Sequence, residues 1–365
     1  MLPASVFPIP ILMRRPAITL AIAFVTSLFS PGPGHAQTYT WSATTGGSWM
    51  NGTDWGSTPT NYPDGPGVRA VFSSLGNGSA KTVTLDDAIT LRRLMFSADQ
   101  TGSVTLAPGT GGSLTLDSTG TGQPTLDVLA GSGNHTITAK VSLVGSNVHK
   151  WNVDANQTLT VSGNISGTQG LTKLQAGTLL LNGTNTYSGP TTVSAGTLGG
   201  MGSIASAVTV AAGATITAGT SPSTPSLTIG GNLALNGRYL VTLFSPGSAS
   251  QLVLPTGTAS LGGSLELALG SGVTVAGMRA GGSQSFTIVN AANGQLSGTF
   301  ATTDFTTAGF AASEWSISYD TASGNATLNF TPVPEPALLL GVCATALLAG
   351  RAVRRRYPVR LATTA

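Results

Sequence analysis

Short runs in which apolar and hydroxyl residues alternate fill the middle of the chain. Residues 112–117, 157–164 and 208–216 show the pattern, with Leu, Val or Ile separated by Thr or Ser. In an extended chain, this alternation places the apolar side chains on one face and the hydroxyls on the other. The runs are bounded by Gly, Asn or Asp, which readily form tight turns. The pattern therefore predicts short β-strands joined by turns.

The strands belong to a repeat. The tetrapeptide Ala-Gly-Thr-Leu begins at Ala176 and again at Ala195, a period of 19 residues. A period near 20 with Gly and Asn corners is typical of one coil of a β-solenoid. We predict an all-β protein with a right-handed parallel β-helix, or solenoid, over residues 81–240 and terminal β caps. A β-sandwich with similar strands is the alternative.

The flanking regions are less regular. Residues 37–80 crowd aromatic side chains together, among them Trp41, Trp49 and Trp55. We expect this segment to be a cap, because an uncapped coil would expose unpaired strand edges. The alternative is a platform on which these three Trp rings stack against sugars. Residues 241–331 contain further strands, which fit either wider final coils or a small β-sandwich.

The N-terminus has the features of an export signal. Two arginines precede an apolar run at residues 17–29, which is too short to span a bilayer comfortably. The small residue Ala36 ends the segment, as a signal peptidase site requires. We predict a signal peptide over residues 1–36, cleaved between Ala36 and Gln37.

The C-terminal residues 332–365 form a three-part tail. Residues 337–350 are uncharged, and an arginine cluster follows them, which predicts a membrane helix whose arginines stay in the cytoplasm. The tail resembles the PEP-CTERM sorting signal of exported Gram-negative proteins. That resemblance implies recognition by an exosortase and removal of the helix. The residues that carry it are Pro334, Glu335, Pro336, Arg354, Arg355 and Arg356.

Part of the repeat region resembles a known family as well. Residues 171–198 are similar to the autotransporter-associated β-strand repeat. The resemblance implies a β-helical, passenger-like surface protein. The segments that carry it are Leu171-Thr172-Lys173, Gly177-Thr178-Leu179, Leu181-Asn182-Gly183, Asn185-Thr186-Tyr187-Ser188-Gly189, Thr191-Thr192-Val193 and Ala195-Gly196-Thr197-Leu198.

Charge is sparse and unevenly distributed. Asp, Glu, Lys and Arg make up only 8% of the chain, against 49 glycines. Residues 37–333 hold 9 Lys and Arg against 12 Asp and Glu, a net charge of −3, so the positive charge of the whole chain comes from its two ends. This balance argues against nucleic-acid binding through a dense basic face. The apolar content argues against a charged disordered chain.

The residues that usually carry catalysis do not form a recognisable set. His135 and His149 lack the spacing of a zinc site, and we expect both to be solvated on a face of the solenoid. The adjacent Asp86 and Asp87 are expected to form a turn after a strand at 81–85, rather than an acid–base pair. We predict no catalytic residue, metal or cofactor.

These features predict an exported, non-enzymatic protein of the cell surface or extracellular matrix, with an adhesive or structural role. The expected partners are signal peptidase and exosortase during processing, and exopolysaccharide as a candidate ligand. Before processing, the C-terminal helix would anchor the chain transiently in the inner membrane. The alternatives are a polysaccharide-active β-helix enzyme and a carbohydrate-binding surface protein.

Overall fold

The computed structural model describes residues 37–58, 60–73, 79–119, 122–219, 221–223, 225–292 and 294–333. The predicted signal peptide and the predicted sorting residues from Pro334 onward lie outside the described residues. Within the described residues, the regular structure is almost entirely strand, with a single short α-helix, α1 (Val275–Ala280).

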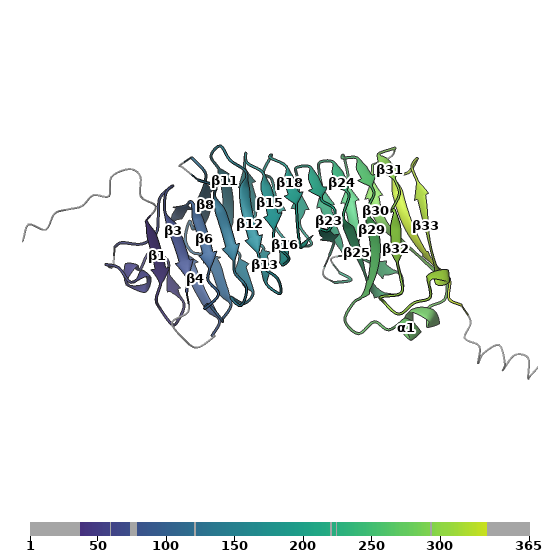
Figure 1. The fold of residues 1–365 in the computed structure, drawn as a ribbon, viewed down its shortest axis with the longest axis horizontal. Helices are drawn as coiled ribbons and strands as arrows, with labels where there is room; N and C mark the ends of the chain where they lie inside the picture. The colour runs from purple at the N-terminus through teal and green to yellow at the C-terminus, as the bar shows by residue number, and fades with distance from the viewer. Residues whose placement is uncertain are drawn as a thin grey trace, which may run out of the picture. The chain divides into compact units, whose positions relative to one another are not determined.

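Two long sheets are built from short strands (Figure 1). Sheet A contains, in spatial order, β1 (Thr38–Trp41), β3 (Arg69–Phe72), β6 (Arg93–Phe96), β9 (Thr125–Val128), β12 (His149–Val153), β15 (Leu171–Leu174), β18 (Thr191–Val193), β21 (Val208–Val210), β24 (Leu233–Leu235), β28 (Ala259–Leu261) and β31 (Leu296–Gly298). Sheet B contains β2 (Gly47–Ser48), β4 (Lys81–Leu85), β7 (Val104–Pro108), β10 (His135–Ile137), β13 (Thr158–Val161), β16 (Thr178–Leu181), β19 (Thr197–Gly199), β22 (Thr215–Thr217), β25 (Arg238–Ser245), β29 (Ser264–Leu269) and β32 (Thr302–Asp304), with β26 (Ser248–Ala249) paired to β25.

The third side is divided between two sheets. Sheet C contains β14 (Ile165–Gly167), β11 (Lys140–Val144), β8 (Ser113–Asp117) and β5 (Ala88–Leu91). Sheet D contains β17 (Thr184–Asn185), β20 (Ser203–Ile204), β23 (Ser226–Ile229), β27 (Gln251–Leu254), β30 (Gln284–Ala291), β34 (Asn325–Phe330) and β33 (Trp315–Asp320).

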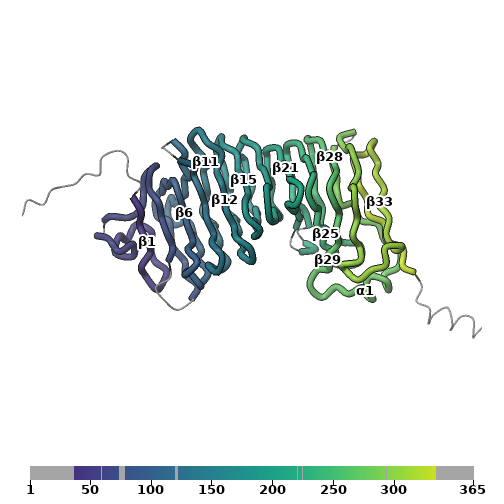
Figure 2. Tube along the Cα trace, viewed as in Figure 1, coloured from purple at the N-terminus to yellow at the C-terminus, as the bar shows by residue number. Residues whose placement is uncertain are grey.

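From β3 onward, the chain visits sheet A, sheet B and the third side in turn, which makes one coil of a solenoid (Figure 2). Neighbouring coils pair in parallel, except where β26, β33 and β34 are involved. The predicted all-β fold with stacked parallel strands is therefore confirmed, while its handedness stays a prediction. Coil length varies: Leu171 pairs with Thr191 and Thr191 with Val208, but Thr125 pairs with Arg93.

The core is a set of rows that run across the coils. Alternation along each strand turns every second residue inward, as in β13, where Leu159 and Val161 are buried and Thr160 lies between them, half-buried. Because the register is parallel, an inward residue stacks on the inward residue of the next coil. No coil could bury its apolar face alone, so each is stabilised by its neighbours.

Residues 241–331, for which the sequence left wider coils and a small β-sandwich as alternatives, continue the solenoid. Strands β28 and β31 extend sheet A, β29 and β32 extend sheet B, and β27 and β30 extend sheet D. The final coils are wider, because α1 and longer loops lie between their strands. The last two strands form a hairpin: β34 pairs antiparallel with β30, and β33 pairs antiparallel with β34 at the edge of sheet D.

Candidate functional site

The repeat at 171–199 uses a buried amide to connect two sheets. Asn185 is 1% exposed, and its side-chain oxygen accepts a hydrogen bond from the Ile165 amide at 3.0 Å. Its side-chain nitrogen donates to the carbonyls of Gly183 (3.1 Å) and Ser203 (2.9 Å). These bonds lie where sheet C ends and sheet D begins, so Asn185 gives the Ile165 amide a partner and connects the end of sheet C to the first strands of sheet D.

Three buried hydroxyls close the next corner. The phenol of Tyr187 lies 2.6 Å from the Thr191 hydroxyl, which in turn lies 3.4 Å from that of Ser206. Burial raises the pKa of Tyr187 to about 12, so the phenol remains protonated at neutral pH. The arrangement fixes one coil of the repeat against the next.

Lys173 is the unusual residue of this coil, because it points inward. It stacks between Trp151 and Val193 in the inner rows of sheet A. Its ammonium group donates to the carbonyls of Leu174 at 2.6 Å and Gln175 at 2.7 Å. Burial lowers the pKa of Lys173 to about 8. The lysine therefore binds two carbonyls at the C-terminal end of β15, where the chain turns at the left-handed Gln175 (φ 63°).

Glycine is required at a corner of the same repeat. Gly196 has φ 68°, and a Cβ there would lie 2.3 Å from the Gly177 carbonyl oxygen of the preceding coil. Any side chain would push the coils apart. The residues that carry the repeat resemblance thus fill structural roles: they satisfy the interior backbone and allow close coil stacking.

The Trp-rich segment packs inward rather than outward. Trp41 and Trp49 are fully buried and Trp55 is 3% exposed. Trp55 lies edge-on to both, with centroid separations of 5.0 Å and 4.6 Å. The indole nitrogens of Trp49 and Trp55 donate to backbone carbonyls. No face of these rings is open to a sugar, so the stacking-platform hypothesis is not supported, and the rings close the first coils instead.

Both histidines are buried, which corrects the expectation that they are solvated. His135 stacks on Phe96 with centroids 4.0 Å apart, and its Nδ1 accepts from the Val104 amide at 3.0 Å. Burial lowers the pKa of His135 to about 4. His149 is also fully buried, and burial lowers its pKa too. Their positions in alternating strands explain the error, since each shares a face with a buried apolar residue two positions on.

The predicted acidic turn is confirmed. Strand β4 ends at Leu85, and the two aspartates follow it directly. Asp86 accepts from the Ser48 hydroxyl at 2.6 Å, and Asp87 accepts from the Ala88 amide at 2.7 Å. Across the described ranges, no group of three or more His, Cys, Asp or Glu side chains is arranged to hold a metal ion.

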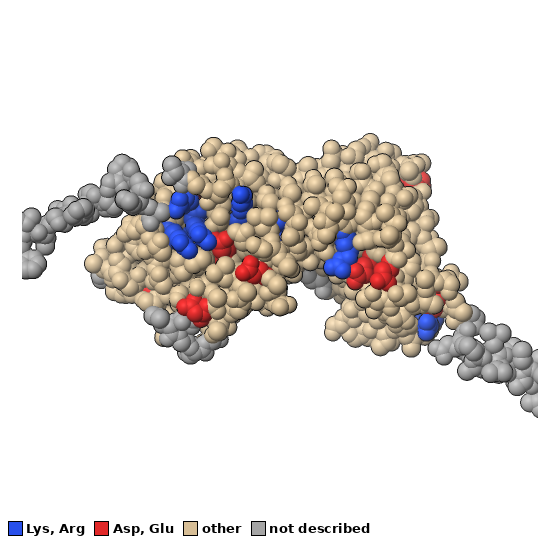
Figure 3. Space-filling view, viewed as in Figure 1, with Lys and Arg blue, Asp and Glu red and all other residues tan. Residues whose placement is uncertain are grey.

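A row of outward side chains runs along sheet A and carries most of the charge on that face. The parallel register places Arg69 beside Arg93, Arg93 beside Thr125, and Thr125 beside Lys150. Asp127 lies next to this row, 3% exposed, where it accepts from Arg93 Nε at 2.5 Å. Figure 3 shows blue side chains gathered over the N-terminal coils with red beside them. The spacing of these residues in the sequence did not reveal the row, because the length of each coil decides which residues become neighbours.

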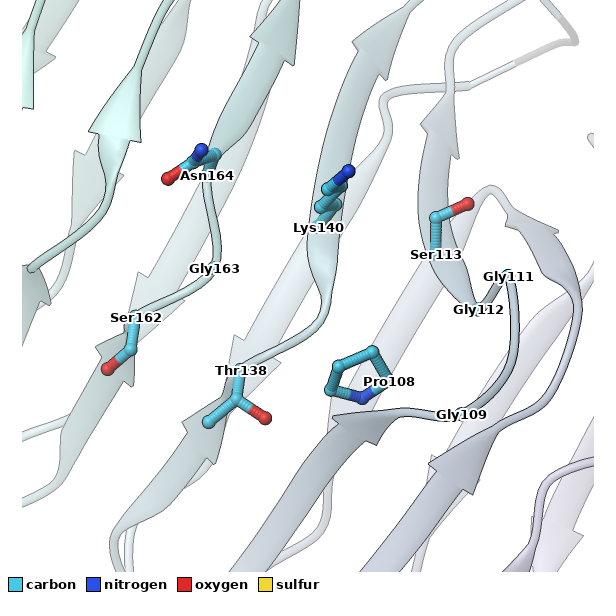
Figure 4. Close-up of a pocket in the computed structure, with 10 residues that line it drawn as sticks. All are labelled: Pro108, Gly109, Gly111, Gly112, Ser113, Thr138, Lys140, Ser162, Gly163 and Asn164. Atoms are coloured by element: carbon cyan, nitrogen blue, oxygen red, sulfur yellow. The ribbon is translucent and has the colours of Figure 1, made fainter.

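A shallow groove of about 590 Å³ crosses the corners between sheets B and C (Figure 4). Glycines, hydroxyls, the Asn164 amide and the Lys140 side chain line it. The lining is polar and lacks both a histidine and a carboxylate. Such a surface can form hydrogen bonds, but it holds no acid–base pair.

Comparison with known proteins identifies the repeat. A family model described as the passenger-associated-transport-repeat matches residues 171–199. This match supports the resemblance to the autotransporter-associated repeat and, through it, an exported surface protein. No curated protein matches the chain, and no solved structure does. Within the part of the chain that the structure describes, no helix is long and apolar enough to cross a membrane.

Proposed function

We propose that this protein is an exported, non-enzymatic repeat protein of the cell surface or extracellular matrix, with an adhesive or structural role. The observation that carries the proposal is the passenger-associated repeat at residues 171–199, which lies within a continuous stack of parallel coils. A solenoid of this kind offers a long, hydroxyl-rich surface held by backbone hydrogen bonds. The interior packing of both histidines supports a binding or structural role rather than catalysis.

Processing at both ends forms part of the proposal. Signal peptidase would cut between Ala36 and Gln37, and an exosortase would act at Pro334-Glu335-Pro336 after the apolar helix and the arginine cluster have held the chain in the inner membrane. The last strand of the solenoid, β34, ends at Phe330, before that motif. Cleavage at the motif would therefore keep every strand described above in the mature protein.

The test combines protease treatment of intact cells with mass spectrometry of the mature termini. The processed chain should be accessible outside the cell, begin at Gln37 and end near Glu335. Glu335→Ala should retain the tail and keep the protein in the membrane fraction. The matched control Pro332→Ala changes a neighbouring residue outside the motif and should be processed normally. An uncut chain in the cytoplasm would contradict the proposal.

A further inference from the structure

The outward row that contains Arg69 continues across the whole of sheet A. We call it the sheet A row, and residue-by-residue pairing of the parallel strands defines it. Its members are Thr38, Arg69, Arg93, Thr125, Lys150, Thr172, Thr192, Thr209, Ala234, Ser260 and Ser297. Hydroxyls therefore line most of the row, and its three charged members are all cations.

One of these cations is neutralised and two are not. Arg93 pairs with Asp127, whose other oxygen accepts from the Asn152 side chain at 2.6 Å. Among the residues that the structure describes, no carboxylate pairs with Arg69 or Lys150. This differs from Arg238, farther along the solenoid, which pairs with Glu266. The N-terminal part of the row thus keeps a net positive charge on a body that is otherwise acidic.

Arg69 is held in a poor environment for a cation. Its Nη2 donates to the thioether of Met95 at 3.2 Å, and sulfur is a weak acceptor. Its Nε is buried and has no hydrogen-bond partner within the described residues. Burial and the neighbouring charge of Arg93 lower the pKa of Arg69, and the nearby carboxylate of Asp127, which is paired with Arg93, offsets only part of this. A carboxylate arriving over the row would supply a direct partner for the Arg69 guanidinium.

The spacing of the row favours an extended ligand. Adjacent strands lie about 4.8 Å apart, so Arg69 and Lys150, three strands apart, are separated by roughly 14 Å along the row. A linear polymer lying along the coils could present one anion to each of these two cations, and its hydroxyls to Thr125 between them and to the threonines beyond Lys150. The row contains no aromatic side chain on which a nucleic-acid base could stack.

We infer that the sheet A row is a binding track for a linear acidic polysaccharide, with uronate carboxylates at Arg69 and Lys150 and sugar hydroxyls at the threonines. This inference rests on the proposed function, because it names the ligand class of an exported matrix protein. The parallel register keeps Arg69 and Lys150 in one line, with the ion pair of Arg93 and Asp127 between them.

The experiment measures binding of the full chain to immobilised polygalacturonate, with dextran and single-stranded DNA as comparison surfaces. The double variant Arg69→Gln, Lys150→Gln should weaken binding to polygalacturonate about tenfold. Lys150→Gln alone should weaken it about threefold, and this exposed residue has no packing role whose loss could unfold the protein. The affinity of the unmodified chain should fall as salt is raised from about 50 to about 200 mM.

The matched control is Lys140→Gln, which removes the same charge from sheet C and should change the affinity less than twofold. Unchanged binding by the double variant, equal binding to dextran, tighter binding to DNA, or an equal loss in Lys140→Gln would each overturn the inference. Protease treatment of cells expressing the same variants tests export separately. If the protein is exported but does not bind polygalacturonate, only the inferred binding track is wrong. If the chain stays in the cytoplasm, the proposed function is wrong.

Discussion

The two ends of the solenoid close an open coil in different ways. At the N-terminal end, the strands remain parallel and a group of aromatic rings fills the first coils: Trp41, Trp49, Trp55 and Phe72. At the C-terminal end, the hairpin of β33 and β34 reverses the strand direction and pairs antiparallel on β30. One end is closed by apolar packing, and the other adds backbone pairing.

Charge separates the two ends further. The C-terminal end contains an ion pair in which Arg279 binds both oxygens of Glu314, at 2.7 and 3.0 Å. At the N-terminal end, the ion pair of Arg93 and Asp127 lies on the outer side of sheet A, and the interior holds rings, where Phe72 stacks on Phe96 and Phe96 on the neutral His135. We therefore expect the two ends to respond differently to cavities, to loss of charge and to acid.

The largest loss of stability is expected from Trp49→Ala. Trp49 is fully buried, with its ring 4.6 Å from that of Trp55, and its removal leaves a cavity at the end of the stack. The free energy of unfolding should fall by about 3–5 kcal/mol. Chemical denaturation measures the loss, and hydrogen exchange should locate it in β1 and β3. Trp49→Phe, which keeps most of the ring, should lose clearly less; an equal loss would contradict a packing role.

A smaller loss is expected from Arg279→Met at the opposite end. The Glu314 side chain is fully buried and also accepts from the Ala311 amide at 2.8 Å. Without its guanidinium, it would be a buried carboxylate with no counter-charge, at a cost of about 3 kcal/mol. Hydrogen exchange should rise in β33 and β34 and stay unchanged in β1.

The solenoid offers a matched control for that variant. Arg238→Met breaks the ion pair with Glu266, but the Arg238 side chain is 43% exposed. Exposed pairs contribute little, so the loss should stay below about 1 kcal/mol. If both variants lost the same stability, burial of the ion pair would not be what closes the C-terminal end.

Alternation along the strands and the repeat were enough to predict the parallel coils. The same alternation also predicts which polar side chains point into the core. His135 stands two residues before the buried Ile137, and Lys173 two residues after the buried Leu171, so each shares its neighbour's inward face. Treating polar residues as solvated by default caused the error, although strand periodicity applies to them equally.

The sheet A row could not be predicted in this way. Arg69 pairs with Arg93, and Arg93 with Thr125, across coils of unequal length. No fixed spacing in the sequence therefore marks which outward residues become neighbours. The C-terminal hairpin was equally hidden, because nothing in the alternation of β33 and β34 distinguishes antiparallel from parallel pairing.

Acid should weaken the N-terminal end first. The pKa of His135 is lowered to about 4 from an ordinary value of 6.5, so the unfolded chain binds more protons between these values and stability falls as the pH drops through that range. The loss by pH 4 should be about 3 kcal/mol. The pKa of Glu314 is also lowered, mainly by Arg279, so the contribution of Glu314 to stability is lost only below the ordinary pKa of a glutamate, 4.5.

Denaturation at pH 7, 5.5 and 4 checks which end loses stability first, and His135→Gln should flatten the upper part of the pH profile. If the C-terminal end lost stability at a higher pH than the N-terminal end, the expected order would be wrong.

The smallest effect concerns the edge of sheet C, which a loop of the N-terminal cap covers. Asp64 accepts from the Thr90 amide at 2.7 Å, and the Gly65 amide donates to the Thr90 carbonyl at 2.7 Å. Asp64→Ala should cost about 1 kcal/mol, because the Thr90 amide of the edge strand β5 then bonds only to water. Hydrogen exchange at Thr90 should rise without a change in β33. Asp64→Asn keeps an acceptor oxygen and should retain most of the protection. If it lost as much as the Ala variant, the charge of Asp64, rather than its hydrogen bond, would protect this edge.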